Sequence, residues 1–327
     1  ARRARRRCHP AVDHGDLAAG EAVLLGVLEE AEEPTERAAV IHDLASLIEP
    51  QGRLDEALER RRQALMIDQE ARGRAHPVVA NRLFYLGETL RLADRIDEAE
   101  SVLRRSNEQF QGMPAPLPSE AAGCGLALAR VLLAQGKSGE AEQLLVDVIA
   151  RVQHEHGRLS PQVLEPQRLL AHLRVQEQRW ESAEAVLIEL LAPLQQNVGE
   201  VHPSVSEALK ELVMVNLAQQ RWRTARGQLE RVFRIDETLY GQASVGLYPV
   251  LDLYIDLYWQ NEKYEQATDY LNRAWTIAHH FPESVAQMPE RLHQRLVQVF
   301  PEHPPGSAIA PEGVATDPTP AELDAAN

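Results

Sequence analysis

The side chains best suited to chemistry in this chain are two groups of histidines and one cysteine. His154, Glu155 and His156 are residues of the kinds that bind zinc. Histidines two residues apart on a helix point to different faces, however, so this group is poorly arranged to share one metal ion. It also falls near an expected helix C-terminus, where the helix dipole favours histidine, and so does His279–His280. We therefore expect no metal site in either group.

The motifs of nucleotide-binding and hydrolytic enzymes are absent from the sequence. It contains no G-x-G-x-x-G, no phosphate-binding loop with GK[ST], no HExxH and no GxSxG. Cys124 lies in the segment AAGCGLALA, where a small buried side chain is a better interpretation than a nucleophile. The sequence therefore predicts a protein that is not an enzyme and that uses no cofactor.

Length and composition indicate a soluble protein that is larger than one ordinary domain. The chain has 327 residues, of which 44% are hydrophobic and 25% charged, enough for two domains or one long repeat array. No run approaches the roughly 18–20 apolar residues of a membrane span, which excludes an integral membrane protein. The net charge is −15 although five arginines stand in the opening ARRARRR. The remaining body is thus strongly acidic, which disfavours general binding to nucleic acid.

The basic start, residues 1–14, has two interpretations. It could contact acidic lipid or nucleic acid, or it could be the solvated end of a helix from an upstream segment, which we prefer. The chain begins at Ala1 and has no apolar targeting segment. Cys8 and Cys124 provide no disulfide framework. We therefore expect a fragment of a larger cytoplasmic chain.

An internal repeat of 42 residues determines the predicted fold. An alanine, here called the anchor, ends six related segments, GRLDEA, DRIDEA, GKSGEA, QRWESA, QRWRTA and EKYEQA. The anchors are Ala57, Ala99, Ala141, Ala183, Ala225 and Ala267. Thirteen residues before the anchor stands Leu in five copies and Tyr in the sixth, and the next residue is small in four of six. Four residues after the anchor stands Leu in five copies and Arg61 in the first.

Each copy is typical of two helices that are joined by a short turn and packed antiparallel. Small residues are needed where the two backbones cross closely, and the anchor and the residue twelve before it provide them. Glycines are expected to end the second helices in a left-handed conformation, and prolines to begin the next helices. The glycines are Gly73, Gly157, Gly199 and Gly241, and the prolines are Pro77, Pro161 and Pro203.

These features resemble the tetratricopeptide repeat, in the 42-residue form found in kinesin light chains and many bacterial proteins. The linkers His76–Pro77 and His202–Pro203 resemble the usual loop of that subfamily. The resemblance covers about residues 37–280. It implies an all-α, right-handed α-solenoid of six helix-turn-helix repeats that binds another protein.

The two ends depart from the repeat. Residues 15–33 are predicted to form an N-terminal half-repeat, and residues 289–300 a C-terminal capping helix, so that the solenoid spans residues 15–300. Residues 301–327 contain five acids and no Lys or Arg, and they are rich in Pro and Ala. This composition predicts a disordered acidic tail.

Aromatic residues gather in the sixth repeat. Six of the seven tyrosines lie between residues 240 and 270. Tyr254, Tyr258 and Tyr264 occupy structural columns, so most of the tyrosines are predicted to be core residues. Trp259 lies off these columns, and it either faces the groove as a binding anchor or packs against the cap.

The family resemblance implies that the first helices line a concave face. The inward columns lie fifteen, eleven and eight residues before each anchor. Candidate partner-binding residues in these columns are Phe84, Glu88, Arg91, Arg130, Arg168, His172, Lys210, Met214, Asp252, Asp256 and Trp259. Either this is merely a solvated helix face, or its basic middle binds a partner. Because unpaired arginine is costly in a concavity, we expect a bound carboxylate or an internal partner such as Glu165 or Glu207.

One column departs from the kinesin-type pattern. Such repeats commonly carry, fourteen residues before the anchor, an Asn that holds a peptide backbone. Here the column reads Asp43, Tyr85, Ala127, Leu169, Glu211 and Leu253. A helical or folded partner is therefore expected as readily as an extended peptide.

We interpret the chain as a non-catalytic scaffold that binds another protein on its concave face, through carboxylates of that partner. Two alternatives remain open. The chain could be the regulatory region of a multidomain signalling enzyme, such as a bacterial protein kinase, with its catalytic domain upstream. It could also belong to a peptide-sensing transcription regulator with an upstream helix-turn-helix segment.

Overall fold

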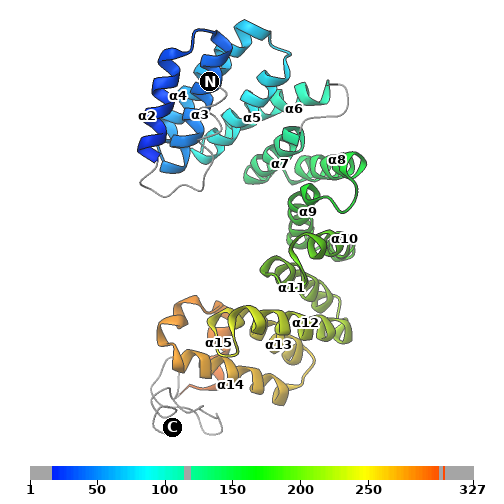
Figure 1. Ribbon diagram of the computed structural model, residues 1–327. Coiled ribbons are helices and arrows are strands. Elements are labelled where there is room, and N and C mark those ends of the chain that lie inside the picture. The colour runs from blue at the N-terminus through cyan, green and yellow to red at the C-terminus, as the bar shows by residue number, and fades with distance from the viewer. Residues whose placement is uncertain (1–16, 114–118, 302–304, 306–327) are drawn as a thin grey trace. The chain divides into compact units, whose positions relative to one another are not determined.

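The computed structural model describes residues 17–113, 119–301 and 305, and these residues form helices joined by short turns. The chain divides into two compact units between Arg158 and Leu159. The basic segment 1–14 and nearly all of the predicted tail lie outside the described residues. Figure 1 shows the helices of each unit following one another in pairs.

The first unit contains a single helix followed by three helix pairs. The single helix is α2 (Leu17–Glu30), and the pairs are α3 (Pro34–Ile48) with α4 (Leu54–Arg72), α5 (Pro77–Leu92) with α6 (Ile96–Gln111), and α7 (Ser119–Ala134) with α8 (Ser138–His156). A short 3-10 turn, η1 (Glu49–Gln51), separates α3 from α4. Within this unit, α4 packs on both α3 and α5, and α6 packs on both α5 and α7.

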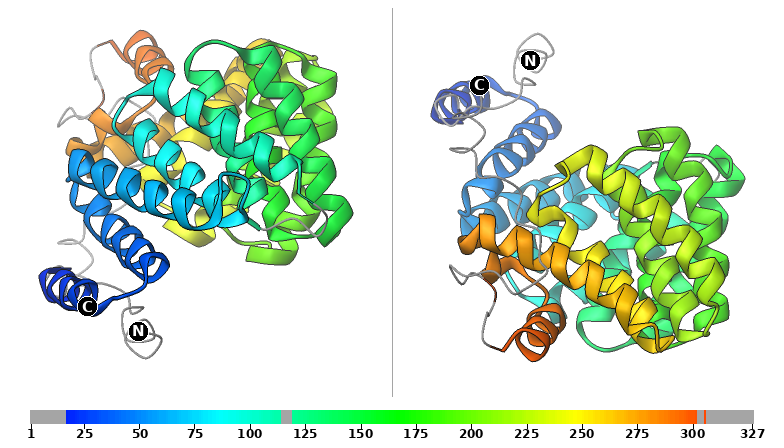
Figure 2. Two further views of the ribbon diagram at one scale, coloured as in Figure 1. Left: turned by 90° about the horizontal axis from the view of Figure 1, so that it is seen from above. Right: turned by 90° about the horizontal axis from the view of Figure 1, so that it is seen from below.

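The second unit contains three more pairs and a final short helix. The pairs are α9 (Leu164–Gln176) with α10 (Trp180–Val198), α11 (Pro203–Ala218) with α12 (Trp222–Tyr240), and α13 (Tyr248–Gln260) with α14 (Tyr264–His280), and the final helix is α15 (Glu290–Val299). Short 3-10 turns precede α9, α13 and α15, namely η2 (Pro161–Val163), η3 (Val245–Leu247) and η4 (Pro282–Gln287). The views of Figure 2 show the pairs of the second unit lying side by side.

The anchor is a fully buried position in every pair. All six anchor alanines are 0% exposed, and each second helix begins three residues before its anchor. The small residue twelve before the anchor is Gly87 in the second pair. A Cβ atom added at Gly87 would lie 2.5 Å from Cγ of Leu103 on the partner helix. In the second pair, the close approach of Leu103 therefore requires glycine at position 87.

The turn inside each pair contains one residue with a left-handed backbone, five positions before the anchor. It is glycine in two copies, but Asp94, Gln178, Gln220 and Glu262 adopt a φ of 57° at the same position. Gln220 closes a Schellman motif in which the Arg221 amide donates to the Asn216 carbonyl at 2.8 Å. The four non-glycine residues carry a steric cost that the sequence pattern does not reveal.

The glycines that end four second helices have a conformation other than the predicted one. Gly73, Gly157, Gly199 and Gly241 have a positive φ, but their ψ lies between 157° and 169°. This region is almost exclusive to glycine, whereas the left-handed helical cap would need a small positive ψ. The chain therefore leaves the helix in an extended direction instead of curling back.

The residue nineteen positions after the anchor caps the next helix. His76 and His202 accept, through Nδ1, the amides of Val78 and Ser204 at 3.2 Å, and a proline follows each histidine as the first helical residue. Ser160 occupies the same position after the third anchor, and its hydroxyl also accepts a backbone amide. The proline that follows it, Pro161, begins the 3-10 turn η2. Pro161 therefore lies in the first helical turn, as predicted, and this turn is a 3-10 turn that runs directly into α9.

Both ends of the array have the expected apolar contacts. Leu24 of α2 is buried against Val40 and Leu44 of α3. Leu292 and Leu296 of α15 are both 0% exposed.

We expect Gln220→Gly to stabilise the protein by about 0.5–1 kcal/mol. Relief of left-handed strain, about 1–2 kcal/mol, exceeds the chain entropy that glycine adds to the unfolded state, about 0.4–1 kcal/mol. The control is Gln219→Gly, because Gln219 has a φ of −91° and its replacement should destabilise. Urea unfolding measures both, and equal losses would contradict the strain at Gln220.

Candidate functional site

In the first unit, the predicted inner-face residues lie on α5 and α7. Phe84 is half-buried, with its ring 4.9 Å from the ring of Tyr85. Glu88 and Arg91, three residues apart on α5, form an ion pair of 3.0 Å. Arg130 is half-buried on α7. Glu88 and Arg91 therefore largely neutralise each other.

A buried polar network lies beside this face, between the first two pairs. Arg61, which replaces the usual leucine, is 3% exposed. Its Nη2 lies 2.8 Å from Glu49 Oε2, and its Nε donates to Thr89 Oγ1 at 2.6 Å. Its Nη1 lies 3.2 Å from His42 Nδ1, and the guanidinium stands 5.3 Å from the centre of the Tyr85 ring. The sequence showed Arg61 as an exception, but its partners come from α3, η1 and α5 and could not be foreseen.

Lys210 of α11 is held inside the second unit. It is only 8% exposed, and its Nζ lies 3.1 Å from both Asp236 Oδ2 and Glu207 Oε1. Burial acts to lower the pKa of Lys210, but the charges of Asp236 and Glu207 more than offset this and raise it. The expected partner Glu207 is present, while the fully buried Asp236 was missed.

Arg168 of α9 occupies the same column one repeat earlier, yet it faces solvent. Leu194 stands where the next repeat has Asp236, so no buried carboxylate draws Arg168 inward. Its side chain is 59% exposed and pairs with the expected Glu165 at 2.9 Å. An exposed pair of this kind contributes about 0–1 kcal/mol, so a carboxylate of another molecule can replace Glu165 at little cost.

His172 and Met214 extend the surface around Arg168. The His172 side chain, one turn along α9, is 53% exposed, and its Nδ1 lies 3.8 Å from Glu211 Oε1 on α11. Burial raises the pKa of Glu211, although the charges of His172 and Arg168 partly oppose this. Met214, three residues beyond Glu211, is 41% exposed. Arg168, His172 and Met214 form what we call the α9–α11 face, which combines basic and apolar groups.

The acidic end of the predicted groove is covered by α15. Asp252 and Asp256 of α13 are 6% and 4% exposed. Arg291 Nη2 lies 2.5 Å from Asp252 Oδ2, and Arg295 Nη2 lies 2.5 Å from Asp256 Oδ1. The guanidinium of Arg295 also stands 5.6 Å from the centre of the Trp259 ring. Of the two interpretations of Trp259, the structure therefore shows packing against the cap.

The tyrosines of the sixth repeat form a stacked core, with one exception. Tyr254 is buried and stacks on Tyr270 at 4.3 Å, and burial raises the pKa of both phenols. Tyr258 is half-buried beside them. Tyr264, which also occupies a structural column, is 53% exposed. Tyr264 is the first residue of the second helix. This position lies at the end of the helix pair, where solvent reaches the side chain.

The residues first considered for chemistry have structural surroundings. His279 stacks on Trp275 at 4.9 Å, and a ring nitrogen of His280 lies 2.8 Å from the Thr276 carbonyl. Across residues 17–113 and 119–301, no three metal-ligating side chains come together. Cys124 is fully buried, and burial raises the pKa of its thiol to about 12. The interpretation of Cys124 as a small core residue is confirmed.

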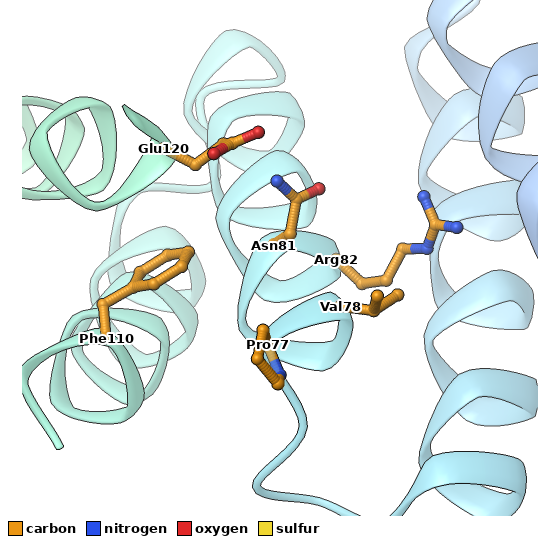
Figure 3. A pocket seen from close by; sticks show the side chains of 6 residues that line it. All are labelled: Pro77, Val78, Asn81, Arg82, Phe110 and Glu120. Atoms are coloured by element: carbon orange, nitrogen blue, oxygen red, sulfur yellow. The ribbon is translucent and has the colours of Figure 1, made fainter. Parts of the chain in front are cut away.

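A shallow cavity of about 300 Å³ lies between α5, α6 and α7. It is lined by Pro77, Val78, Asn81, Arg82, Phe110 and Glu120 (Figure 3). Figure 3 shows the Arg82 guanidinium pointing away from Phe110 and Glu120, toward the buried Asp68, with which its Nε pairs at 2.9 Å. The main charged group of the cavity is thus used inside the unit.

The helix pairs and their small-residue crossing identify the repeat. Residues 36–111 match the model of the tetratricopeptide repeat family. These residues belong to the tetratricopeptide repeat family. In this repeat protein, the matched residues hold the first two helix pairs, and the same 42-residue spacing continues to the last anchor, Ala267.

Solved structures share the fold at low sequence identity. A Podosopora anserina protein of the kinesin-light-chain kind, with nearly identical TPR-like repeats, has a TM-score of 0.54 at 24% identity, over 64% of this chain and 98% of its own. BtubC from P. vanneervenii has a TM-score of 0.55 at 16% identity, over 81% and 96%. Aspartyl phosphate phosphatase F from Bacillus subtilis has a TM-score of 0.55 at 13% identity, over 90% and 78%.

Two further comparisons concern the whole chain. No curated protein sequence matches it. In the part of the chain that the structure describes, every helix is too short or too polar to cross a membrane.

We expect Lys210→Met to cost about 3–5 kcal/mol, because it leaves the buried Asp236 carboxylate without its cation. The double variant Lys210→Met with Asp236→Leu should recover most of this loss, since Leu194 fills the equivalent position in the preceding repeat. Denaturant unfolding of both variants measures the difference. A double variant no more stable than the single one would show that the ion pair is not the cause.

Proposed function

We propose that this chain is a non-catalytic interaction module that binds another protein on its first helices, with the α9–α11 face as the main site. The observation that carries the proposal is the exposure of Arg168 and His172, at 59% and 53% of their side chains. Other cations of the inner columns are used internally, as Lys210 is by Asp236 and Arg91 by Glu88.

The chemistry of this face favours a partner that presents carboxylates. A guanidinium binds a carboxylate through charge-assisted hydrogen bonds, which are stronger than neutral ones. His172, four residues along the same helix, can contribute a second donor, and Met214 offers an adaptable apolar contact for the rest of the partner. The partner is therefore an Asp- or Glu-rich surface, or a chain terminus, with an apolar group beside it.

The form of the partner follows from the column that lacks asparagine. Leu169 and Glu211 occupy that column on α9 and α11, and neither can pair with a peptide group through a side-chain amide. A helix or a folded surface, which satisfies its own backbone, fits such a face better than an extended strand does. Phe84 and Arg130 of the first unit are proposed as further contacts of the same columns.

The setting we propose is the cytoplasm, and nucleic acid is not a proposed partner. A protein with a net charge of −15 repels a polyphosphate, yet a local basic patch can still steer an acidic protein. The buried free thiol of Cys124 is compatible with a reducing compartment.

A glutamate-rich fluorescent peptide serves as a defined probe for this face. We expect Arg168→Glu to weaken its binding about tenfold, the worth of one charge-assisted hydrogen bond. The matched control is Arg226→Glu, because Arg226 is an exposed arginine on α12 that pairs with Glu230 at 3.0 Å. Fluorescence anisotropy at low and high salt measures both.

Binding to the unmutated protein should also weaken as salt rises, because exposed charges are screened. Circular dichroism should show equal helicity for both variants. Equal binding by Arg168→Glu and by Arg226→Glu, or binding indifferent to salt, would place the site elsewhere.

A further inference from the structure

Two columns of the first helices meet where one first helix lies beside the next. One column stands fifteen residues before an anchor, and the other stands eighteen residues before the next anchor. In the first unit they hold Phe84 of α5 and Gly123 of α7, and a Cβ atom added at Gly123 would lie 3.4 Å from Cζ of Phe84. In the second unit they hold Asp252 of α13 and Arg291 of α15, which form an ion pair of 2.5 Å. Side chains of opposite charge can therefore pair directly at these positions.

The same two columns hold Arg168 of α9 and Glu207 of α11, which have opposite charges but do not pair with each other. Arg168 pairs with Glu165 of its own helix at 2.9 Å, and Glu207 pairs with Lys210 of its own helix at 3.1 Å. The side chains of Arg168 and Glu207 are 59% and 67% exposed. A cation and an anion on neighbouring first helices are thus both open to solvent.

The negative charge of Glu207 is not cancelled by Lys210. Lys210 Nζ also lies 3.1 Å from Asp236 Oδ2, so one cation faces two carboxylates and the group keeps a net negative charge. Asp236 is fully buried, whereas Glu207 is exposed, so the buried carboxylate depends on Lys210 far more than Glu207 does. Glu207 can therefore turn to a cation of another molecule at little cost.

The charges of Arg168 and Glu207 act on the same part of the α9–α11 face. Glu211 stands one turn along α11 from Glu207, and burial raises its pKa. His172 and Arg168 oppose this rise in the pKa of Glu211, while Glu207 adds to it. Arg168 and Glu207 therefore both lie within electrostatic range of one half-buried carboxyl group.

We propose that Arg168 and Glu207 together select a partner helix that presents a carboxylate and, four residues away on the same face, a lysine or arginine. The carboxylate pairs with Arg168, and the cation pairs with Glu207. Residues four apart are neighbours on a helix surface, and packed helices have axes about 8–10 Å apart, so long side chains of one helix can reach α9 and α11 together. The inference rests on the proposed function and adds Glu207 as the residue that determines specificity.

A uniformly acidic partner fits this face less well than a partner with both charges. Its second carboxylate would stand beside Glu207, where like charges repel. A partner with one charge of each sign is attracted at both positions. Its direction is also fixed, because turning it end for end would place like charges together at Arg168 and at Glu207.

Three fluorescent helical peptides test this selection. The first carries Glu and Lys four residues apart, and the second carries Glu at both positions. The third has the composition of the first, but its Lys stands two residues from Glu and so lies on another face. Fluorescence anisotropy should show the first peptide binding the unmutated protein about two- to fivefold more tightly than either of the others, as expected for one exposed ion pair.

Glu207→Lys should invert the preference, so that the peptide with two glutamates binds more tightly than the first peptide. Glu207→Gln should remove the preference, and it leaves Lys210 paired with Asp236. The matched control is Glu189→Lys, which makes the same change of charge at an exposed residue of α10 and should keep the original order. Circular dichroism checks that the variants stay folded and that the three peptides are equally helical.

A second measurement needs no ligand. In urea unfolding, the effects of Arg168→Gln and Glu207→Gln should add, because these two side chains do not pair. Asp252→Asn and Arg291→Gln serve as the control, and their effects should not add, because Asp252 and Arg291 form an ion pair.

A peptide preference that Glu207→Lys leaves unchanged would overturn the proposal, as would a failure of all three peptides to bind. Effects of Arg168→Gln and Glu207→Gln that do not add would also overturn it, because the two side chains would then occupy each other. If Arg168→Glu weakens binding of the glutamate-rich peptide while the Glu207 variants change no preference, this inference alone fails. If Arg168→Glu leaves that binding unchanged, the proposed function fails as well.

Discussion

The close crossing of the two helices in each pair is the constraint on which the other features depend. A fully buried alanine stands on the second helix of every pair, a small residue stands on the first helix of four pairs, and at Gly87 there is no room even for a Cβ atom. This contact fixes the register of the pair, and the register decides which side chains face the next pair. The crossing gives Arg168 and Lys210 equivalent positions in successive pairs, and the residue that each then meets decides its exposure.

The sequence was sufficient to predict the helix pairs because their determinants are local and repeated. The small residues and leucines recur every 42 residues, and all six second helices begin at the same point relative to the anchor. Backbone detail was less predictable. Gln220 adopts a left-handed φ that its residue type disfavours, because the tertiary contacts of both helices hold the turn in place. Gly199 indicated in the sequence that α10 ends there, but not that the glycine would have a ψ near that of extended backbone.

The candidate site was predictable only as a set of columns. Lys210 and Arg168 are equivalent in the repeat, and what separates them is Asp236 or Leu194, which belongs to a different helix and lies 26 residues further along the chain. Comparison of that second column across the repeats would have shown the buried aspartates. The coverage of Asp252 and Asp256 depends on α15, whose arginines carry no repeat signal of their own. Side chains that lie far apart in sequence therefore decide which members of a column stay available.

The most direct test of this account is the unfolding free energy of Gly87→Ala beside Gly227→Ala. Glycine within a helix normally destabilises by about 0.5–1 kcal/mol relative to alanine. Gly227 of α12 has nothing within 4 Å of an added Cβ, so its replacement should stabilise the protein by that amount. Gly87→Ala should instead destabilise by about 1–3 kcal/mol, because the methyl group overpacks the crossing against Leu103. If both replacements stabilised the protein equally, the close crossing would not be the constraint that organises the repeat.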